Sequence, residues 1–155
     1  MKLTSKGRYG LRAIVDLAIH SEEEPVSIKS ISARQGISER YLEQIIGKMK
    51  KSGIVESVRG AAGGYHLARD ASDISVGDIL RCLEGDLSIV NCPEINETKC
   101  EASQLCVTKY VWQKINDGIQ DTINHITLDE LAVQSKQLLT EHQGIERGKS
   151  GCDEK

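Results

Sequence analysis

The sequence contains no phenylalanine, and only four tyrosines and one tryptophan occur among its 155 residues. A core with so few aromatic rings must be mainly aliphatic, and a small aliphatic core often gains stability by dimerisation. No apolar run approaches the roughly 18 residues needed to span a bilayer, and the N-terminal segment MKLTSKGRYG lacks the apolar region of a signal peptide. We therefore expect a cytoplasmic protein without membrane contact.

Motifs of the common enzyme classes are also missing. We find no Ser/His/Asp set and no paired-carboxylate cleft, and the glycine-rich segment 60–64 lacks the Gly-Lys-Ser/Thr of a phosphate-binding loop. These absences favour a protein that is not an enzyme. A small redox or electron-transfer protein is the alternative from another functional class.

Charge is divided unevenly along the chain. Residues 1–70 carry 12 Lys and Arg against 8 Asp and Glu, whereas residues 71–155 carry 8 against 15, so net charges of +4 and −7 underlie the overall −3. A basic N-terminal half is compatible with contacts to phosphates, although such asymmetry is often only a matter of solubility.

The first half has the pattern of a helix-turn-helix. Residues 11–20 have helical spacing, a second helix follows Ser27 and stops at Gln35-Gly36, and Ser38 begins a third helix that ends at Gly53. The short connection between the last two helices is typical of this motif, whose second helix enters the major groove. On that helix Gln44 suits adenine and Glu43 suits the cytosine amino group, but a solvated face of mixed charge is the alternative.

A small hairpin is expected next. Residues 54–59 and 65–69 resemble strands that flank the small-residue turn 60–64, and Arg59 at the tip is suited to a narrow minor groove. The predicted fold is therefore mainly α with a small β-hairpin wing, a winged helix-turn-helix over residues 1–82.

Three cysteines lie in or beside an irregular loop at residues 83–105. Cys92, Cys100 and Cys106 are separated by seven and five residues, which matches neither the Cys pairs of structural zinc sites nor ferredoxin spacings. Three thiolates suit an iron–sulfur cluster, and Cys106 would lie at a helix N-terminus, where the dipole stabilises a thiolate. Three unrelated thiols are the alternative; Cys82 is expected to be a buried core thiol.

A helical pattern follows, over residues 106–135, with a long helix and a short final one. Apolar residues repeat every fourth position on the long helix and are expected to pair with a second copy of the chain: Val107, Val111, Ile115, Ile119 and Ile123. Residues 136–155 are expected to form a mostly disordered tail.

Several segments resemble the bacterial winged-helix repressors that include IscR, NsrR and CymR: MKLTSKGRYGLRAIVDLA, SERYLEQIIGKMKKSGIVESVRGAAGGYHLAR and VGDILRCLEG. The resemblance extends from Met1 to about Leu131. It implies a homodimer that binds a palindromic operator in double-stranded DNA. The expected contacts are Ser5, Tyr9, Ser38, Arg40, Tyr41, Glu43, Gln44 and Arg59, with Lys48 on the same helix face.

The resemblance also implies an iron–sulfur cluster of the [2Fe-2S] type, because IscR-like members carry three cysteines in this loop, ahead of this helix. Here the loop between the first two is two residues longer. The fourth ligand is open: Lys109 stands where IscR-type proteins have histidine, and Arg8 stands where NsrR-type proteins have a carboxylate. The candidates for the fourth cluster ligand are Asn96, Glu97, Glu101, an added thiol or water.

The resulting hypothesis is a repressor that senses iron–sulfur cluster status and controls cluster-biogenesis genes. One rival is a CymR-like, cluster-free regulator of cysteine and sulfur metabolism that acts through a partner protein; an NsrR-like response to nitric oxide is another. Iron–sulfur assembly or cysteine-synthesis proteins are the expected protein partners.

Overall fold

The computed structural model describes residues 3–60, 62–90, 92, 100 and 105–149. Its elements, in chain order, are α1 (Ser5–His20), α2 (Ile28–Gln35), α3 (Glu39–Lys51), β1 (Val55–Val58), β2 (Gly64–Leu67), the short 3-10 helix η1 (Ala71–Asp73), α4 (Val76–Glu84), α5 (Thr108–His125) and α6 (Leu128–Lys149). The expected fold class, mainly helical with one β-hairpin, is confirmed. Within the described residues, no helix is long and apolar enough to cross a membrane.

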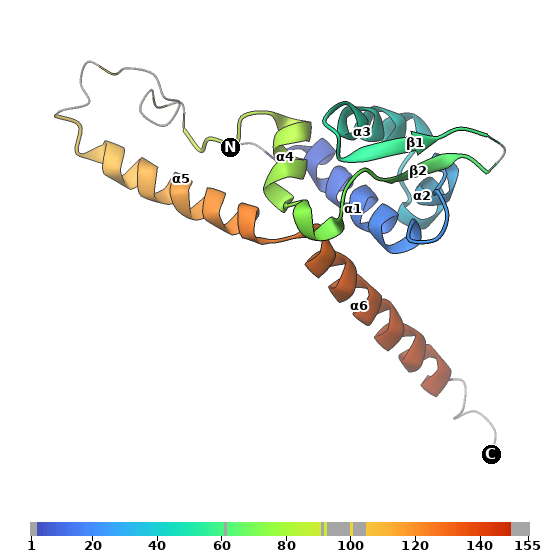
Figure 1. The fold of residues 1–155 in the computed structure, drawn as a ribbon. Coiled ribbons are helices and arrows are strands. Elements are labelled where there is room, and N and C mark those ends of the chain that lie inside the picture. Colours follow the sequence, from blue (N-terminus) through green and yellow to red (C-terminus); the bar gives the residue numbers. More distant parts are fainter. Residues whose placement is uncertain (1–2, 61, 91, 93–99, 101–104, 150–155) are drawn as a thin grey trace.

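Helix α1 is the centre of the N-terminal unit and is surrounded by α2, α3, α4 and α6 (Figure 1). The buried core is aliphatic, as the lack of phenylalanine requires. Its largest fully buried side chains are Ile14, Leu17, Ile31, Leu42, Ile45, Ile46, Met49, Ile54, Ile74, Ile79, Leu83 and Leu128. Burial of these side chains is the main contribution to the stability of the unit.

The helix-turn-helix forms where the sequence predicted it. The Ser27 hydroxyl accepts a hydrogen bond from the backbone N–H of Ser30 and starts α2. Gly36 ends α2 with φ of 64°, a left-handed conformation that glycine adopts without steric cost. Ser38 occupies the N-cap position of α3, but its side chain makes no capping hydrogen bond.

The wing is a two-stranded antiparallel hairpin. Its register pairs Val55 with Leu67 at the base and Val58 with Gly64 near the tip. An isolated bridge between Val26 and Tyr65 joins the hairpin to the segment before α2. The wing is thereby fixed to the helix-turn-helix.

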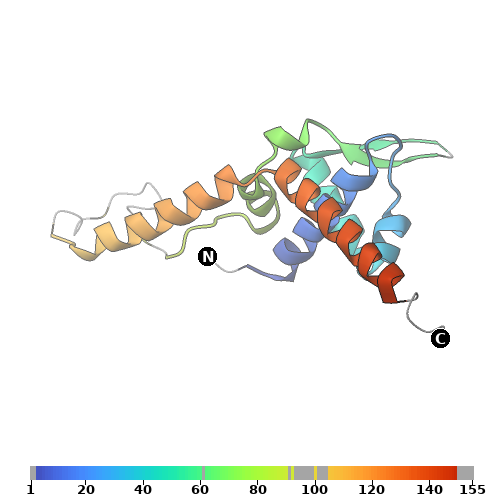
Figure 2. The same cartoon turned by 90° about the horizontal axis from the view of Figure 1, so that it is seen from below.

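The C-terminal part leaves this unit and then returns to it. Helix α5 has its N-terminal end far from the unit and its C-terminal end beside α4, and α6 then packs across α1 (Figures 1 and 2). Helix α6 has 22 residues and extends to Lys149. The expectation of a short final helix and a mostly disordered tail from residue 136 is therefore corrected for residues 136–149; residues 150–155, with Cys152, lie outside the described residues.

Candidate nucleic-acid interface and cysteine loop

Helix α3 has one buried and one exposed face. Leu42, Ile45, Ile46 and Met49 anchor it in the core. The exposed positions include Arg40, Glu43, Gln44 and Lys48, all of which the sequence assigned to DNA contact. Their polar groups point away from the core, as direct reading of base edges requires.

Four of the expected contact residues meet at the start of this helix. Ser5, Tyr9, Ser38 and Tyr41 line one shallow hollow together with the turn residues Gly36 and Ile37. The rings of Tyr9 and Tyr41 meet edge to face, with centroids 5.9 Å apart and planes at 89°. Residues from α1 and α3 thus form one continuous surface. Arg59 is exposed at the separate tip of the wing.

Lys48 lies at the edge of the α3 surface, close to a second amine. Its Nζ donates a 3.3 Å hydrogen bond to the backbone oxygen of Leu83. The neighbouring Lys6 side chain, followed by partial burial, lowers the pKa of Lys48. Two adjacent basic groups are a favourable environment for an anion such as a phosphate.

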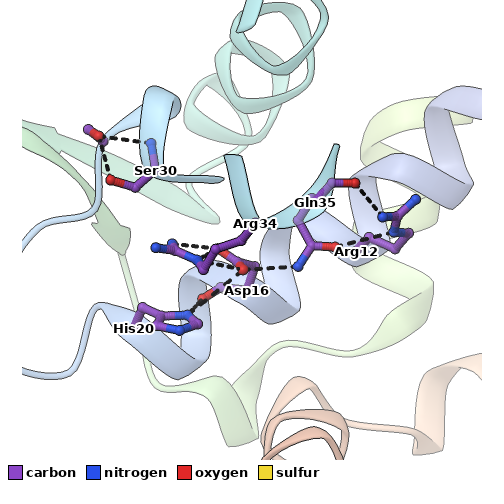
Figure 3. Close-up of polar contacts among 7 residues, drawn as sticks. Arg12, Asp16, His20, Ser30, Arg34 and Gln35 are labelled. Atoms are coloured by element: carbon purple, nitrogen blue, oxygen red, sulfur yellow. Dashed lines mark hydrogen bonds and ion pairs between the residues drawn. The ribbon is translucent and has the colours of Figure 1, made fainter. Parts of the chain in front are cut away.

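A buried carboxylate, which no local sequence pattern predicts, connects α1 to the end of α2 (Figure 3). The side chain of Asp16 is only 2% exposed. It accepts hydrogen bonds from Arg34 Nε at 2.9 Å and Nη2 at 2.7 Å, and from Gln35 Nε2 at 2.9 Å. Hydrogen bonding to Asp16 raises the pKa of Arg34. His20 Nδ1 lies 2.8 Å from the backbone oxygen of Asp16.

A second carboxylate fastens α1 to α4. The backbone N–H groups of Thr4 and Gly7 each donate a 2.8 Å hydrogen bond to Glu84 Oε1, and the Thr4 hydroxyl donates as well. Glu84 is the last residue of α4 and immediately precedes the segment that leads to Cys92. The cysteine loop therefore begins at a residue that holds the N-terminus of a helix on the proposed DNA-contacting surface.

The three loop cysteines are free, partly buried thiols, as is Cys82. Cys106 precedes α5, and its pKa is lowered by a hydrogen bond with the Thr108 hydroxyl, 3.3 Å away, and by the backbone N–H of Lys109. Cys82 instead packs against the core and accepts a 3.0 Å hydrogen bond from Ser52 Oγ. Cys82 therefore lies at the edge of the core and is partly buried, rather than the buried core thiol that the sequence predicted.

The donor chemistry of the loop fits an iron–sulfur cluster, because the thiols are unpaired and hydrogen bonds lower the pKa of Cys106. Their positions are not those of an assembled site: among the described residues, no three His, Cys, Asp or Glu groups lie close enough to hold a metal ion. Lys109 extends over the Tyr110 ring, 5.2 Å from its centroid. The suggested ligands Asn96, Glu97 and Glu101 lie outside the described residues.

Helix α5 carries an exposed apolar surface, which we call the α5 surface. Its members are Val107, Tyr110, Val111, Trp112 and Ile115, with exposed fractions from 38% to 78%. Of the other expected dimer residues, Ile119 is half-buried and Ile123 packs against Val76, Leu80 and Leu87 of its own chain. The cause is geometric: a spacing of four residues advances about 40° around a helix at each step, so the row winds from one side to the other.

Known proteins are similar to this chain in sequence. Residues 3–134 match the model of the Rrf2 family, described as iron-dependent transcriptional regulators. The transcriptional regulator IscR of Pectobacterium atrosepticum is 43% identical over 139 residues, which are 90% of this chain and 83% of that protein. IscR of Vibrio parahaemolyticus is 40% identical over 146 residues, 94% of this chain and 86% of that protein.

Solved structures of related regulators have the same fold. The structure of T. potens IscR has a TM-score of 0.71 and 45% identity, with 89% of this chain and 90% of that chain covered. CymR, the global cysteine regulator of B. subtilis, has a TM-score of 0.73 and 37% identity, with 86% of this chain and 98% of that chain covered. The chain belongs to the Rrf2 family, and it is a DNA-binding transcriptional regulator of the IscR type rather than an enzyme.

Proposed function

We propose that this regulator is a homodimeric repressor that carries an iron–sulfur cluster, [2Fe-2S], on Cys92, Cys100 and Cys106. In this proposal it adjusts the expression of cluster-biogenesis genes to the supply of clusters. One observation carries it. The loop with the three free thiols joins α4, which belongs to the DNA-binding unit, to α5, which carries the exposed apolar surface.

The DNA-binding unit would read a palindromic operator through two copies of the same surface. Helix α3 would enter the major groove with Arg40, Glu43 and Gln44 at base edges, while the Ser5, Tyr9, Ser38 and Tyr41 cluster and Lys48 contact the backbone. Arg59 at the wing tip would enter the minor groove. The α5 surface supports a dimer, because several exposed large apolar residues grouped along one helix are typical of a protein–protein interface.

The residues around the loop suggest how cluster occupancy reaches the DNA. A bound cluster would supply iron atoms that take thiolate ligands and can change oxidation state. Gathering Cys92, Cys100 and Cys106 would restrain the loop between Glu84 and α5. Since Glu84 holds the N-terminus of α1, such a restraint favours one placement of the contact surface over others.

The experiment is anaerobic reconstitution of the full chain, followed by iron and sulfide counts and visible and paramagnetic resonance spectra. Alanine variants at Cys92, Cys100 and Cys106 are compared with Cys82→Ala, whose thiol lies outside the loop. We expect each loop variant to lose most of its iron and sulfide and Cys82→Ala to retain both. A colourless, iron-free wild-type protein after reconstitution would overturn the proposal.

A cluster-free regulator of cysteine metabolism is the second candidate. It is favoured by the separation of the loop thiols and by Lys109, because lysine is not among the usual ligands of iron–sulfur clusters. The similarity to a protein named as a global cysteine regulator also supports it. If all three loop cysteines can be replaced by alanine without change in DNA binding or its regulation, this candidate replaces the first, and cysteine-synthesis proteins become the partners to test.

A further inference from the structure

The buried Asp16 carboxylate has more partners than charge neutralisation requires. Arg34 alone forms a two-pronged ion pair with it, through Nε and Nη2. Such a pair already compensates much of the cost of burying the carboxylate. The additional hydrogen bond from Gln35 Nε2 therefore has another consequence: it fixes the orientation of the Gln35 side chain (Figure 3).

Gln35 passes this orientation on to a residue of α1. Its Oε1 accepts a 3.2 Å hydrogen bond from Arg12 Nε, and its backbone oxygen accepts a second one from Arg12 Nη2 (Figure 3). Because the amide nitrogen faces Asp16 and the amide oxygen faces Arg12, both ends of the amide are used. Ordering the two long side chains of Gln35 and Arg12 in this way costs conformational entropy. Neutralising the Asp16 carboxylate does not require this ordering.

Arg12 extends the path to the aromatic pair of the proposed DNA-contacting surface. Its guanidinium carbon lies 5.7 Å from the centroid of the Tyr9 ring, within cation–π range. Tyr9 in turn meets Tyr41 of α3 edge to face. A continuous series of contacts thus runs from the buried carboxylate to the recognition helix.

The same residues also hold the turn that precedes α3. Arg34 and Gln35 are the last two residues of α2, and Gly36 and Ile37 follow them. Ile37 is 5% exposed, and its backbone oxygen accepts a 2.7 Å hydrogen bond from Ser32 Oγ. Asp16 therefore fastens the end of α2 at the point where the chain changes direction into α3.

We infer that Asp16 is a positioning residue for DNA recognition. Both of its routes end at Tyr41. One runs through Gln35 and Arg12 to the aromatic pair, and the other runs through Arg34 to the turn that leads into the first turn of α3, where Tyr41 lies. The inference rests on the proposed contact of Tyr41 with DNA. Asp16 itself is buried and touches no DNA in this account.

A double-mutant cycle tests the inference on the full chain. The probe is a duplex that the wild-type protein enriches from random-sequence DNA, and its dissociation constant is measured at one fixed salt concentration. The variants are Asp16→Asn, Tyr41→Ala and their combination. Gln35→Met is added because it leaves the Asp16–Arg34 pair in place while it removes the amide contacts to Asp16 and Arg12. Thermal unfolding of each variant identifies any that are not folded.

A matched control uses a second ion-paired carboxylate. Asp78 lies on α4 and pairs with Arg69 and Arg81, away from the path to Tyr41. Asp78→Asn changes the net charge by the same amount as Asp16→Asn. Its effect on affinity should be the same with and without Tyr41→Ala.

We expect Asp16→Asn and Gln35→Met each to weaken binding about fivefold to tenfold, and Asp16→Asn to have less than about a twofold effect when Tyr41 is alanine. Additive effects of Asp16→Asn and Tyr41→Ala, or wild-type affinity of folded Gln35→Met, would overturn the inference. Failure of the wild-type protein to enrich any duplex would instead contradict its function as a DNA-binding regulator, so the two failures are distinguishable.

Discussion

The backbone N–H of Gly7 donates a 2.8 Å hydrogen bond to Glu84, and a Cβ atom at Gly7 would lie only 2.7 Å from the same carboxylate oxygen. Helices α1 and α4 therefore meet at a glycine because a side chain would separate them. Gly10, one turn later, lies against Leu83 in the same way. This close approach links the DNA-binding unit to the start of the cysteine loop.

Gly10→Ala tests the packing of α1 on α4. The new Cβ would overlap Leu83 Cδ1, and Leu83 is only 2% exposed, so its side chain has little room to move. We expect a loss of about 1–3 kcal/mol in the free energy of unfolding, measured by urea denaturation. Gly47→Ala is the control, since nothing lies within 4 Å of its Cβ, and should be neutral or stabilising by up to about 1 kcal/mol. Equal losses in both variants would contradict the account of this contact.

Glu84→Gln tests the role of charge at the same contact. Burial alone would raise the pKa of Glu84, but hydrogen bonds from Thr4 and Gly7 outweigh it and lower the pKa below the ordinary value of 4.5. The charged form therefore stabilises the fold above about pH 4.5, and this contribution is lost as the pH falls through the lower pKa of the folded state.

Since Glu84 is partly exposed, the difference in unfolding free energy between wild type and Glu84→Gln should stay below about 1 kcal/mol at pH 7. It should shrink as the pH approaches 3. Unfolding measured at both pH values checks this expectation. A difference that grows on acidification would have the wrong sign for a carboxylate with a lowered pKa.

Val111→Glu tests the α5 surface as the dimer contact. Val111 is 52% exposed in the single chain, and a carboxylate in an apolar interface would be left without a partner. We expect the dissociation constant of the dimer, measured by sedimentation, to rise at least about tenfold. Val133→Glu on α6 is the matched control, with the original valine 48% exposed. If the control dissociates the dimer equally, the interface lies elsewhere.

Arg59→Ala tests the wing. Because Arg59 is exposed at the hairpin tip, we expect the variant to keep its fold and its iron content. The slope of log affinity against log salt should decrease in magnitude by about 1, as for the loss of one phosphate-neutralising contact. An unchanged slope together with unchanged affinity would remove Arg59 from the DNA surface.

Local signals in the sequence are sufficient to predict the helices and the turn of the DNA-binding unit. Ser27 as a cap, Gly36 as a left-handed stop and the buried row of α3 all act within a few residues, so the helix-turn-helix could be predicted. The partners of Asp16 could not, because Arg34 lies 18 residues away and only the packed helices bring them together. Glu84 and Thr4, 80 residues apart, are a stronger example of the same limit.

The C-terminal part shows a different limit. Residues 136–149 have weak helical amphipathicity and two glycines, so the composition resembled that of a disordered segment, but the chain continues α6 through them. The apolar row of α5 suggests a single face in the sequence, but residues spaced four apart wind around a helix. Only the packing of Ile123 against α4 separates the residues held within the chain from those left exposed.

The most direct test of the central claim compares DNA binding by cluster-loaded and cluster-free protein. The enriched duplex is titrated anaerobically at fixed salt with wild type, Cys106→Ala and Cys82→Ala, each before and after reconstitution. We predict that reconstitution changes the affinity of wild type and Cys82→Ala by at least about fivefold and leaves Cys106→Ala unchanged. Equal affinity of loaded and cluster-free wild-type protein would contradict the claim that this regulator senses an iron–sulfur cluster.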